Sequence, residues 1–325
     1  MTTREHINEY FNGKSFLTLC ALALVAVSAL ALSMGLTPAD DDSTGIFFSL
    51  KGGLLSNGPL SAAVNVLCLL ATGGIMLALN KAFSYVRAVT HLMVSAFFLF
   101  QVANPAGLVA LNNGTLLCLV AAMAIMPLFA SFHNRHCQRS IFLIFALLTA
   151  GCMFNYGFLA LVPAFLLGFV NMGVFNLKGV LAMLFGLITP FWIVLGLGLV
   201  TPSDALAPRW LLLGDIPFTP MAALAAATAL LGIMLAVMNL HTIMNYRMQT
   251  RVYGTFFVIV LVFMVIALAL DHRHLAVYLP LLSLMVSVQI AQAHTLRATH
   301  GYRYVFILLL IVACIAFAAA NLLMP

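Results

Sequence analysis

Three adjacent carboxylates are the part of this sequence best suited to chemistry. Asp40, Asp41 and Asp42 follow the first long apolar run of the chain. Carboxylate oxygens bind divalent cations, and a carboxylate can also act as a general base. In an extended turn alternate residues face the same way, so Asp40 and Asp42 could share one ion. The alternative is that a short acidic, turn-forming segment simply solvates a loop.

Two later polar segments contain groups that could act together with these carboxylates. One is the loop 201–218 with Arg209, and the other is the turn Asp271-His272-Arg273-His274. Arg209 or Arg273 could clamp a phosphate, because a guanidinium forms paired hydrogen bonds with phosphate oxygens. His272 or His274 could carry a proton or bind a metal ion. The alternative for the turn is a polar cap between two helices, since spacing alone does not show that these loops converge.

A further His and Cys cluster does not have the spacing of a metal site. His133, His136 and Cys137 lie close together in a basic segment. A structural zinc site needs four ligands in spaced pairs, and the sequence has no second pair, so a basic loop at the membrane surface is the better interpretation. The chain also has no GxxxxGK[ST], GxSxG or HExxH motif. This cluster therefore indicates no zinc site, and the sequence identifies no cofactor.

The composition places these residues in a membrane protein. Hydrophobic residues make up 64% of the 325 residues and charged residues only 7%, too few to coat a soluble globule. About 20 apolar residues cross the hydrocarbon layer as a helix. Eleven segments meet that criterion, near 15–35, 59–80, 84–104, 114–132, 140–154, 157–174, 179–200, 219–240, 254–271, 275–295 and 303–323.

These segments predict an all-α fold, a polytopic transmembrane bundle of about eleven helices (ten to twelve). Residues 1–325 form a single integral membrane domain in this prediction, because the polar stretches near 36–58 and 201–218 are shorter than domains that fold alone. The apolar but Gly-broken segment 45–55 is too short to cross a bilayer. It is expected to lie along the interface after the first helix.

The segments 140–154 and 157–174 leave two alternatives open: two crossings, or one broken or re-entrant unit, which would invert the rest of the chain if it crosses the membrane only once. With two crossings, eleven of the fourteen Lys and Arg fall in loops on one side, and all six Asp fall on the other. Cytoplasmic loops are rich in Lys and Arg. This pattern favours two crossings in a bacterial inner membrane, with the N-terminus cytoplasmic and the C-terminus periplasmic. The net charge of +6 needs no nucleic acid as a partner, because lipid head groups can meet these cations.

Few polar groups fall within the predicted spans. No Asp or Glu lies in their cores, which disfavours an ion-coupled carrier, and His91 is the one ionisable residue clearly inside a span. The amides are expected to form hydrogen bonds between helices. They are Asn65, Gln101, Asn104, Asn155, Asn171, Asn239, Gln289 and Gln292. A hydrated passage lined by Asn155, Asn171 and Gln289 would instead favour a facilitator.

Several apolar stretches resemble a known family. Residues 154–169, 175–182 and 186–192 are similar to an uncharacterised multi-pass membrane protein family of Bacteroidota, within a likeness that covers about 61–200. That resemblance implies a membrane location and no reaction. In architecture the chain also resembles membrane glycosyltransferases that use polyprenyl-phosphate sugars. This second resemblance implies an acidic catalytic motif in the first outer loop, where Asp40, Asp41 and Asp42 stand.

Three functions are compatible with the sequence. The protein could handle a lipid-linked envelope substrate, or it could be a non-catalytic membrane subunit or scaffold. The third alternative is a facilitator or flippase that lacks an ion-coupling carboxylate. The expected partners are the lipid bilayer and either a lipid-linked substrate or another membrane protein.

Overall fold

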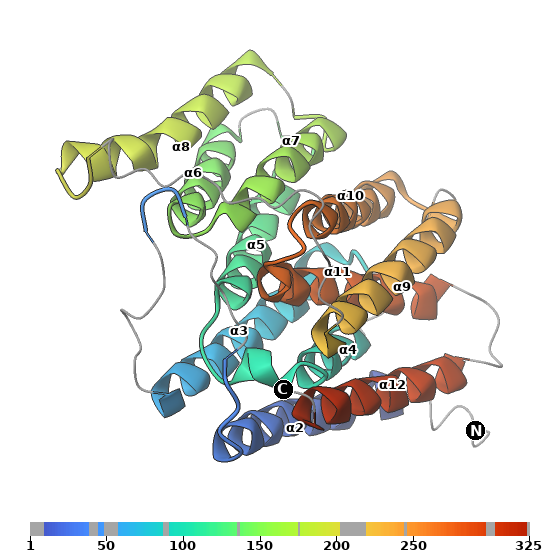
Figure 1. The fold of residues 1–325 in the computed structure, drawn as a ribbon. Helices are drawn as coiled ribbons and strands as arrows, with labels where there is room; N and C mark the ends of the chain where they lie inside the picture. The colour runs from blue at the N-terminus through green and yellow to red at the C-terminus, as the bar shows by residue number, and fades with distance from the viewer. Residues whose placement is uncertain are drawn as a thin grey trace.

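A computed structural model describes residues 10–38, 45–48, 58–86, 91–134, 137–174, 176–201, 219–243, 246–296 and 303–323. Throughout these residues the regular structure is helical, as predicted. The helices are α2 (Lys14–Ser33), α3 (Gly58–Phe83), α4 (Leu92–Val102), η1 (Pro105–Leu108), α5 (Asn113–Ala130), α6 (Gln138–Phe154), η2 (Tyr156–Ala160), α7 (Leu161–Asn171), α8 (Leu177–Gly196), α9 (Pro220–Ile243), α10 (Met248–Leu270), α11 (Leu275–Leu296) and α12 (Arg303–Leu323). Figure 1 shows them as a bundle, with α8 at one edge and α12 at the opposite edge.

Eight of these helices are long and apolar enough to cross a membrane, whereas α4, α6 and the η2–α7 unit are shorter. The eight include α2, α3, α5 and the helices from α8 to α12. Isolated apolar helices of this length have no stable place in water, because their side chains would remain exposed to it. These helices are therefore compatible with a multi-pass integral membrane protein, as the composition predicts.

The chain doubles back between α6 and α7. The backbone N–H of His133, shortly before α6 begins, donates a hydrogen bond to the carbonyl of Met172, directly after α7 ends (3.4 Å). Asn171 Nδ2 also donates to the Val252 carbonyl (3.0 Å), near the start of α10. The beginning of α6 and the end of α7 thus lie at the same end of the bundle, so this region consists of two antiparallel segments.

The third predicted span is shorter than expected. A helix was predicted over 84–104, but α4 covers only Leu92–Val102. Ser84 has a positive φ of 48°, which ends α3 in a turn. The Asn80 side-chain oxygen then accepts a hydrogen bond from the Val86 N–H (2.9 Å), and the Tyr85 hydroxyl donates to the Met76 carbonyl (3.1 Å). These bonds hold residues 84–86 against α3 and delay the start of α4.

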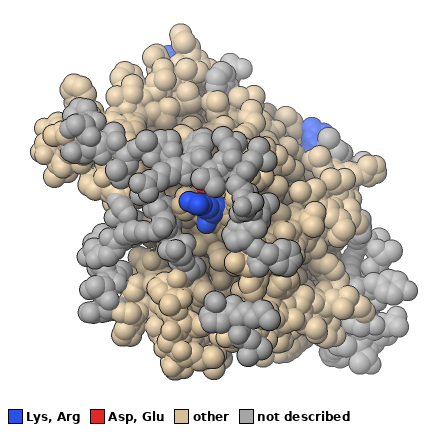
Figure 2. Space-filling view, in the orientation of Figure 1, with Lys and Arg blue, Asp and Glu red and all other residues tan. Residues whose placement is uncertain are grey.

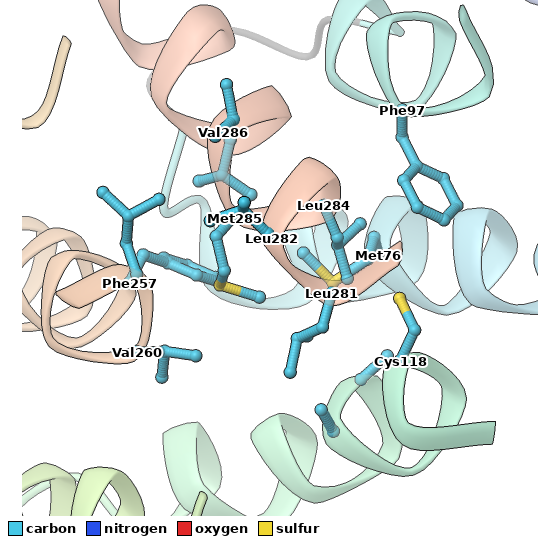
Figure 3. Close-up of a cluster of buried hydrophobic side chains, with 14 of the residues drawn as sticks. Met76, Phe97, Cys118, Phe257, Val260, Leu281, Leu282, Leu284, Met285 and Val286 are labelled. Atoms are coloured by element: carbon cyan, nitrogen blue, oxygen red, sulfur yellow. The ribbon is translucent and has the colours of Figure 1, made fainter. Parts of the chain in front are cut away.

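Helix α11 is the core of the bundle. Every residue from Leu275 to Gln292 is buried, and α4, α5, α9 and α10 pack around this helix. Figure 3 shows its side chains between those of α10 on one side and those of α3, α4 and α5 on the other. The residues it labels are Met76, Phe97, Cys118, Phe257, Val260, Leu281, Leu282, Leu284, Met285 and Val286. This helix fixes the position of its neighbours, including the turn that precedes it.

Charged side chains separate toward the two ends of the bundle. We call the end where α2 begins the Lys14 end, and the end where α11 begins the Asp271 end. Among residues whose side chains the structure describes, six Lys and Arg lie at the Lys14 end, namely Lys14, Lys81, Arg139, Lys178, Arg247 and Arg251. Arg273 is the one described Lys or Arg at the Asp271 end. On the face displayed in Figure 2, residues other than Lys, Arg, Asp and Glu predominate among the described residues.

Candidate functional site

The structure describes part of the predicted set of reactive residues. Asp40, Asp41, Asp42 and Arg209 lie outside the described residues. The turn that joins α10 to α11 contains the remaining four. Asp271 is the residue that caps the end of α10, and α11 begins directly after His274. Of the loops that were predicted to converge, the structure therefore describes only the turn 271–274.

Asp271 is the centre of a hydrogen-bonded cluster. His274 Nδ1 lies 2.7 Å from Asp271 Oδ1 and 2.9 Å from Oδ2. The Tyr278 hydroxyl donates to Oδ2 (3.0 Å), from the first turn of α11. Asp271 itself is only 8% exposed. The turn therefore caps the helices, as one interpretation predicted, and also holds a buried carboxylate between two donors.

The other two residues of the turn face different surroundings. His272 is buried, and its Nε2 atom has no hydrogen-bond partner. Arg273 is exposed at the surface. Only His274 of the two imidazoles is paired with the carboxylate, so the two are not equivalent. Within the described part of the chain, no group of three or more His, Cys, Asp and Glu residues could hold a metal ion.

A pocket with a volume of about 230 Å³ adjoins this cluster. One water needs roughly 10–15 Å³ by the same measure, so the pocket has room for a much larger group. Its walls come from η2, from the last turns of α10 and from the turn with its following helix. The lining residues are Tyr156, Leu159, Ala160, Phe263, Ile266, Ala267, Leu270, Asp271 and Tyr278. Apart from the carboxylate and two phenols, the lining is apolar.

The break between α6 and η2 places Tyr156 at this pocket. The Asn155 side-chain oxygen accepts a hydrogen bond from the Gly157 N–H (2.6 Å) and so caps the new turn. A Cβ at Gly157 would lie 2.9 Å from Val277 Cγ1, which shows how closely η2 approaches α11. The sequence signalled the break as a polar pair with a glycine. Sequence reasoning missed Tyr156 and Tyr278, because two ordinary aromatic residues give no sign that they meet.

The segment Gly45–Phe48 closes the end of α6 beside η2. The Ile46 N–H donates to the Cys152 carbonyl (3.1 Å), and the Phe48 N–H donates to the Met153 carbonyl (3.0 Å). These carbonyls belong to the last turn of a helix, where partners within the helix are lacking. The rings of Phe48 and Phe154 stack with centroids 5.3 Å apart. Residues 45–48, the described part of the segment 45–55, are thus attached to the last turn of α6.

Most of the buried amides form the bonds between helices that the sequence predicts. Gln101 donates to the Ser283 hydroxyl (2.7 Å), and Asn239 donates to the side-chain oxygen of Gln289 (3.0 Å). Asn171 donates a hydrogen bond to the Val252 carbonyl of α10. In contrast, Gln292 is buried and neither of its side-chain polar atoms has a partner. A hydrated passage was suggested for Asn155, Asn171 and Gln289. Each of them instead forms a hydrogen bond with a different partner, namely the Gly157 N–H, the Val252 carbonyl and the Asn239 side chain.

His91 lies outside the helical spans, contrary to expectation. It is the N-cap residue of α4 and not an internal residue of a span. Its N–H donates to the Asn12 carbonyl (3.4 Å). Burial, and secondarily the nearby Lys14 ammonium, lowers the pKa of His91. The late start of α4 explains the difference.

Comparison of the chain with protein-family models, with curated proteins and with solved structures finds no match. The resemblances to a Bacteroidota membrane family and to polyprenyl-phosphate-sugar glycosyltransferases stay predictions from the sequence.

Proposed function

We propose that this protein handles a lipid-linked substrate of the cell envelope, which binds in the pocket beside Asp271. The observation that carries the proposal is the composition of the pocket. Its walls are apolar, and one end holds a buried carboxylate between two hydrogen-bond donors. Ligand sites commonly combine apolar walls with a few placed polar groups. An amphiphile has both the chain and the head group that such a site requires.

The position of the pocket mouth supports a lipid as the ligand. Leu159, Ile266 and Leu270 line the pocket and are also exposed, by 44%, 47% and 41% of their surface. Such large exposed apolar side chains on a membrane helix face acyl chains. A lipid can therefore enter from the side without passing through water.

The predicted phosphate clamp and proton carrier fit this location. Arg273 lies in the same turn as Asp271 and is exposed, so it can meet a phosphate at the mouth of the pocket. His274 contacts the carboxylate through Nδ1. In this proposal Asp40, Asp41 and Asp42 would act as metal ligands or base in a reaction of the lipid head group, with Arg209 as a second phosphate contact. Gly45–Phe48 follow these aspartates closely in the chain and are bonded to the last turn of α6, just before η2 begins, which supports this arrangement.

The rival function is a non-catalytic subunit whose exposed helices bind a partner. Helix α8 is the least buried of the eight long apolar helices, and its Trp192 is 76% exposed. In a bilayer, acyl chains cover such a face as well as a protein partner would. The exposure of α8 therefore does not favour the scaffold over the lipid-handling protein.

For the membrane we propose a bacterial inner membrane, with the Lys14 end in the cytoplasm and the C-terminus in the periplasm. The six described cations at the Lys14 end support this orientation, because cytoplasmic loops are enriched in Lys and Arg. The pocket then opens in the outer half of the bilayer. A lipid-linked envelope substrate is used on that side.

Cysteine labelling tests the orientation. Arg273→Cys and Lys178→Cys are introduced separately after the six native cysteines have been replaced by alanine. Both native side chains are exposed, at opposite ends of the bundle. A membrane-impermeant maleimide should label Arg273→Cys in intact cells and Lys178→Cys only after permeabilisation. The reverse pattern would place the pocket in the cytoplasmic half.

Filling the pocket should prevent lipid binding. Ala267 lies on the α10 wall, and Ala267→Phe would occupy the space that an acyl chain needs. We expect the amount of lipid retained by the purified protein to fall at least about tenfold, which corresponds to about 1.4 kcal/mol of binding free energy. Native mass spectrometry of the protein released from detergent measures this. Ala160→Phe, on the η2 wall, should have the same effect.

The matched control is Ala269→Phe. Ala269 lies on the same helix and is exposed, but it does not line the pocket. Its substitution adds the same ring to the lipid-facing surface and should leave the retained lipid unchanged. Equal lipid retention in Ala267→Phe, Ala160→Phe and Ala269→Phe would show that the pocket is not the binding site.

A further inference from the structure

We propose that the lipid bound in this pocket carries a primary ammonium group next to its phosphate, and that this ammonium pairs with Asp271. The ligand class is then the amine-bearing phospholipids, of which phosphatidylethanolamine is the simplest. This inference rests on the proposed function, since it names the amphiphile that the same pocket selects.

The carboxylate has unused capacity for a donor from the ligand. An ionised carboxylate has about four lone-pair positions. His274 Nδ1 and the Tyr278 hydroxyl supply two donors to Asp271, at 2.7 Å and 3.0 Å. Asp271 also lines the pocket, whereas His274 does not. The imidazole therefore orients the carboxylate from behind and leaves its pocket side for the ligand.

The charge of the site selects a cation over a phosphate or a hydroxyl. Asp271 is the one charged side chain among the described residues that line the pocket. A buried charge in apolar surroundings is costly unless a partner neutralises it. A phosphate would add to the negative charge, and a hydroxyl would not offset it, whereas an ammonium provides both a positive charge and N–H donors.

The same turn provides a cation for the phosphate of such a lipid. Arg273 follows Asp271 closely in the sequence and is exposed, so its guanidinium lies outside the apolar pocket. A phosphoethanolamine head group has its ammonium and phosphate separated by a short two-carbon link. The ammonium can then lie at the carboxylate while the phosphate stays at the mouth, near an arginine that binds phosphate through paired hydrogen bonds.

One wall of the pocket extends along the direction that an acyl chain would take. Phe263, Ile266, Ala267 and Leu270 follow the spacing i, i+3, i+4 and i+7, so they form a single stripe on α10. This stripe leads from Asp271 toward the middle of the helix. A ligand anchored at the carboxylate by its head group can therefore place its chain against the stripe, which a free head group cannot do.

Competition between lipids tests the head group. The full-length protein is purified in detergent and presented with equal amounts of phosphatidylethanolamine, phosphatidylcholine and phosphatidylglycerol, and the bound lipids are counted by native mass spectrometry. We expect the primary amine to bind at least about tenfold better than the quaternary amine, which lacks N–H donors, and the anionic lipid. Equal binding of the three would overturn the inference. Displacement of the lipid by soluble glycerophosphoethanolamine at the same concentration would also overturn it, because the chain would then contribute nothing.

The variant Asp271→Asn tests whether Asp271 is the group that selects the ammonium. Asp271→Asn keeps the size and a hydrogen-bonding group but removes the charge, so the preference for phosphatidylethanolamine over phosphatidylglycerol should fall at least about tenfold while both lipids still bind. Arg273→Ala should weaken the binding of phosphatidylethanolamine and of phosphatidylglycerol about equally. An unchanged preference in Asp271→Asn would assign the selectivity to another group. The wild-type competition needs no variant, so the inference remains testable if Asp271→Asn does not fold.

The two proposals fail in different ways. If Ala267→Phe removes lipid but the wild type shows no head-group preference, the pocket binds lipid and the ammonium inference is wrong. If Ala267→Phe and Ala160→Phe leave lipid binding unchanged, the pocket is not the site and both proposals are wrong.

Discussion

Replacing Gly114 with leucine is expected to destabilise the protein by roughly 3 kcal/mol or more, because side chains forced into a packed interface cost about 1–3 kcal/mol and a clash with backbone cannot relax by a rotamer change. A Cβ at Gly114 would meet the carbonyl of Ala276, and it would lie 2.7 Å from the Val277 carbonyl oxygen and 3.0 Å from Pro280 Cδ. Pro280 has no N–H, so the carbonyl of Ala276 lacks its usual partner within the helix. The first turn of α5 comes close to α11 at this point, which only a residue without a side chain permits.

The measurement is the thermal unfolding of the purified protein in detergent, with Gly74→Leu as the control. Gly74 lies within α3, and a Cβ there would have no atom within 4 Å. Glycine inside a helix is about 0.5–1 kcal/mol less favourable than alanine, so the control should be neutral or slightly more stable. Equal unfolding temperatures for the two variants would show that α5 does not approach α11 as closely as the structure has it.

The positions of many helices could be predicted from the sequence because the lipid-crossing criterion is simple. The predicted spans 275–295 and 303–323 agree closely with α11 and α12. Both are long apolar runs bounded by polar residues, so length and composition suffice. The prediction was wrong for α4 because apolar residues also occur in a non-helical segment. Tyr85 and Val86 are buried there by hydrogen bonds to α3, which hydropathy does not register.

The central position of α11 could be predicted from its polar residues, which the search for apolar spans does not consider. Ser283, Ser287, Gln289 and Gln292 lie along this one helix, and all four are buried. Polar side chains in a membrane helix face other helices and not lipid. A helix with polar residues all around it must be surrounded by protein. The buried polar residues along α11 therefore predict that this helix forms the core.

The candidate site could be predicted only in part. The acidic and basic residues of the turn from Asp271 to His274 were recognisable from their types. The pairing of Asp271 with His274 Nδ1 depends on the geometry of the turn, and the pocket depends on the approach of η2 to α10. That approach brings Tyr156 to residues far from it in the sequence. Contacts of this kind are set by tertiary packing, which one sequence without relatives does not reveal.

At the opposite end of the bundle, an aromatic cluster around Tyr253 connects α10 to α5. Its ring stacks on Phe129 with centroids 4.2 Å apart and an interplanar angle of 17°. The Tyr253 hydroxyl donates to the Phe129 carbonyl (3.2 Å) and accepts from Gln249 Nε2 (3.0 Å). Phe83 and Phe132 make edge contacts with the same ring. Because lipid is as apolar as these side chains, their contribution is close packing and not removal from water.

Tyr253→Ala is therefore expected to destabilise the protein by roughly 3–5 kcal/mol, the range for deletion of a large buried aromatic side chain. Tyr253 is 1% exposed, so the deletion leaves a cavity that neither lipid nor water fills. Tyr253→Phe keeps the ring and loses only the hydroxyl bonds, and it should cost about 1 kcal/mol. Thermal unfolding in detergent measures both variants against Phe185→Ala, whose native side chain is 63% exposed on α8. A loss for Tyr253→Ala no larger than that for Phe185→Ala would mean that acyl chains or detergent reach the ring, and that α10 and α5 are not packed through it.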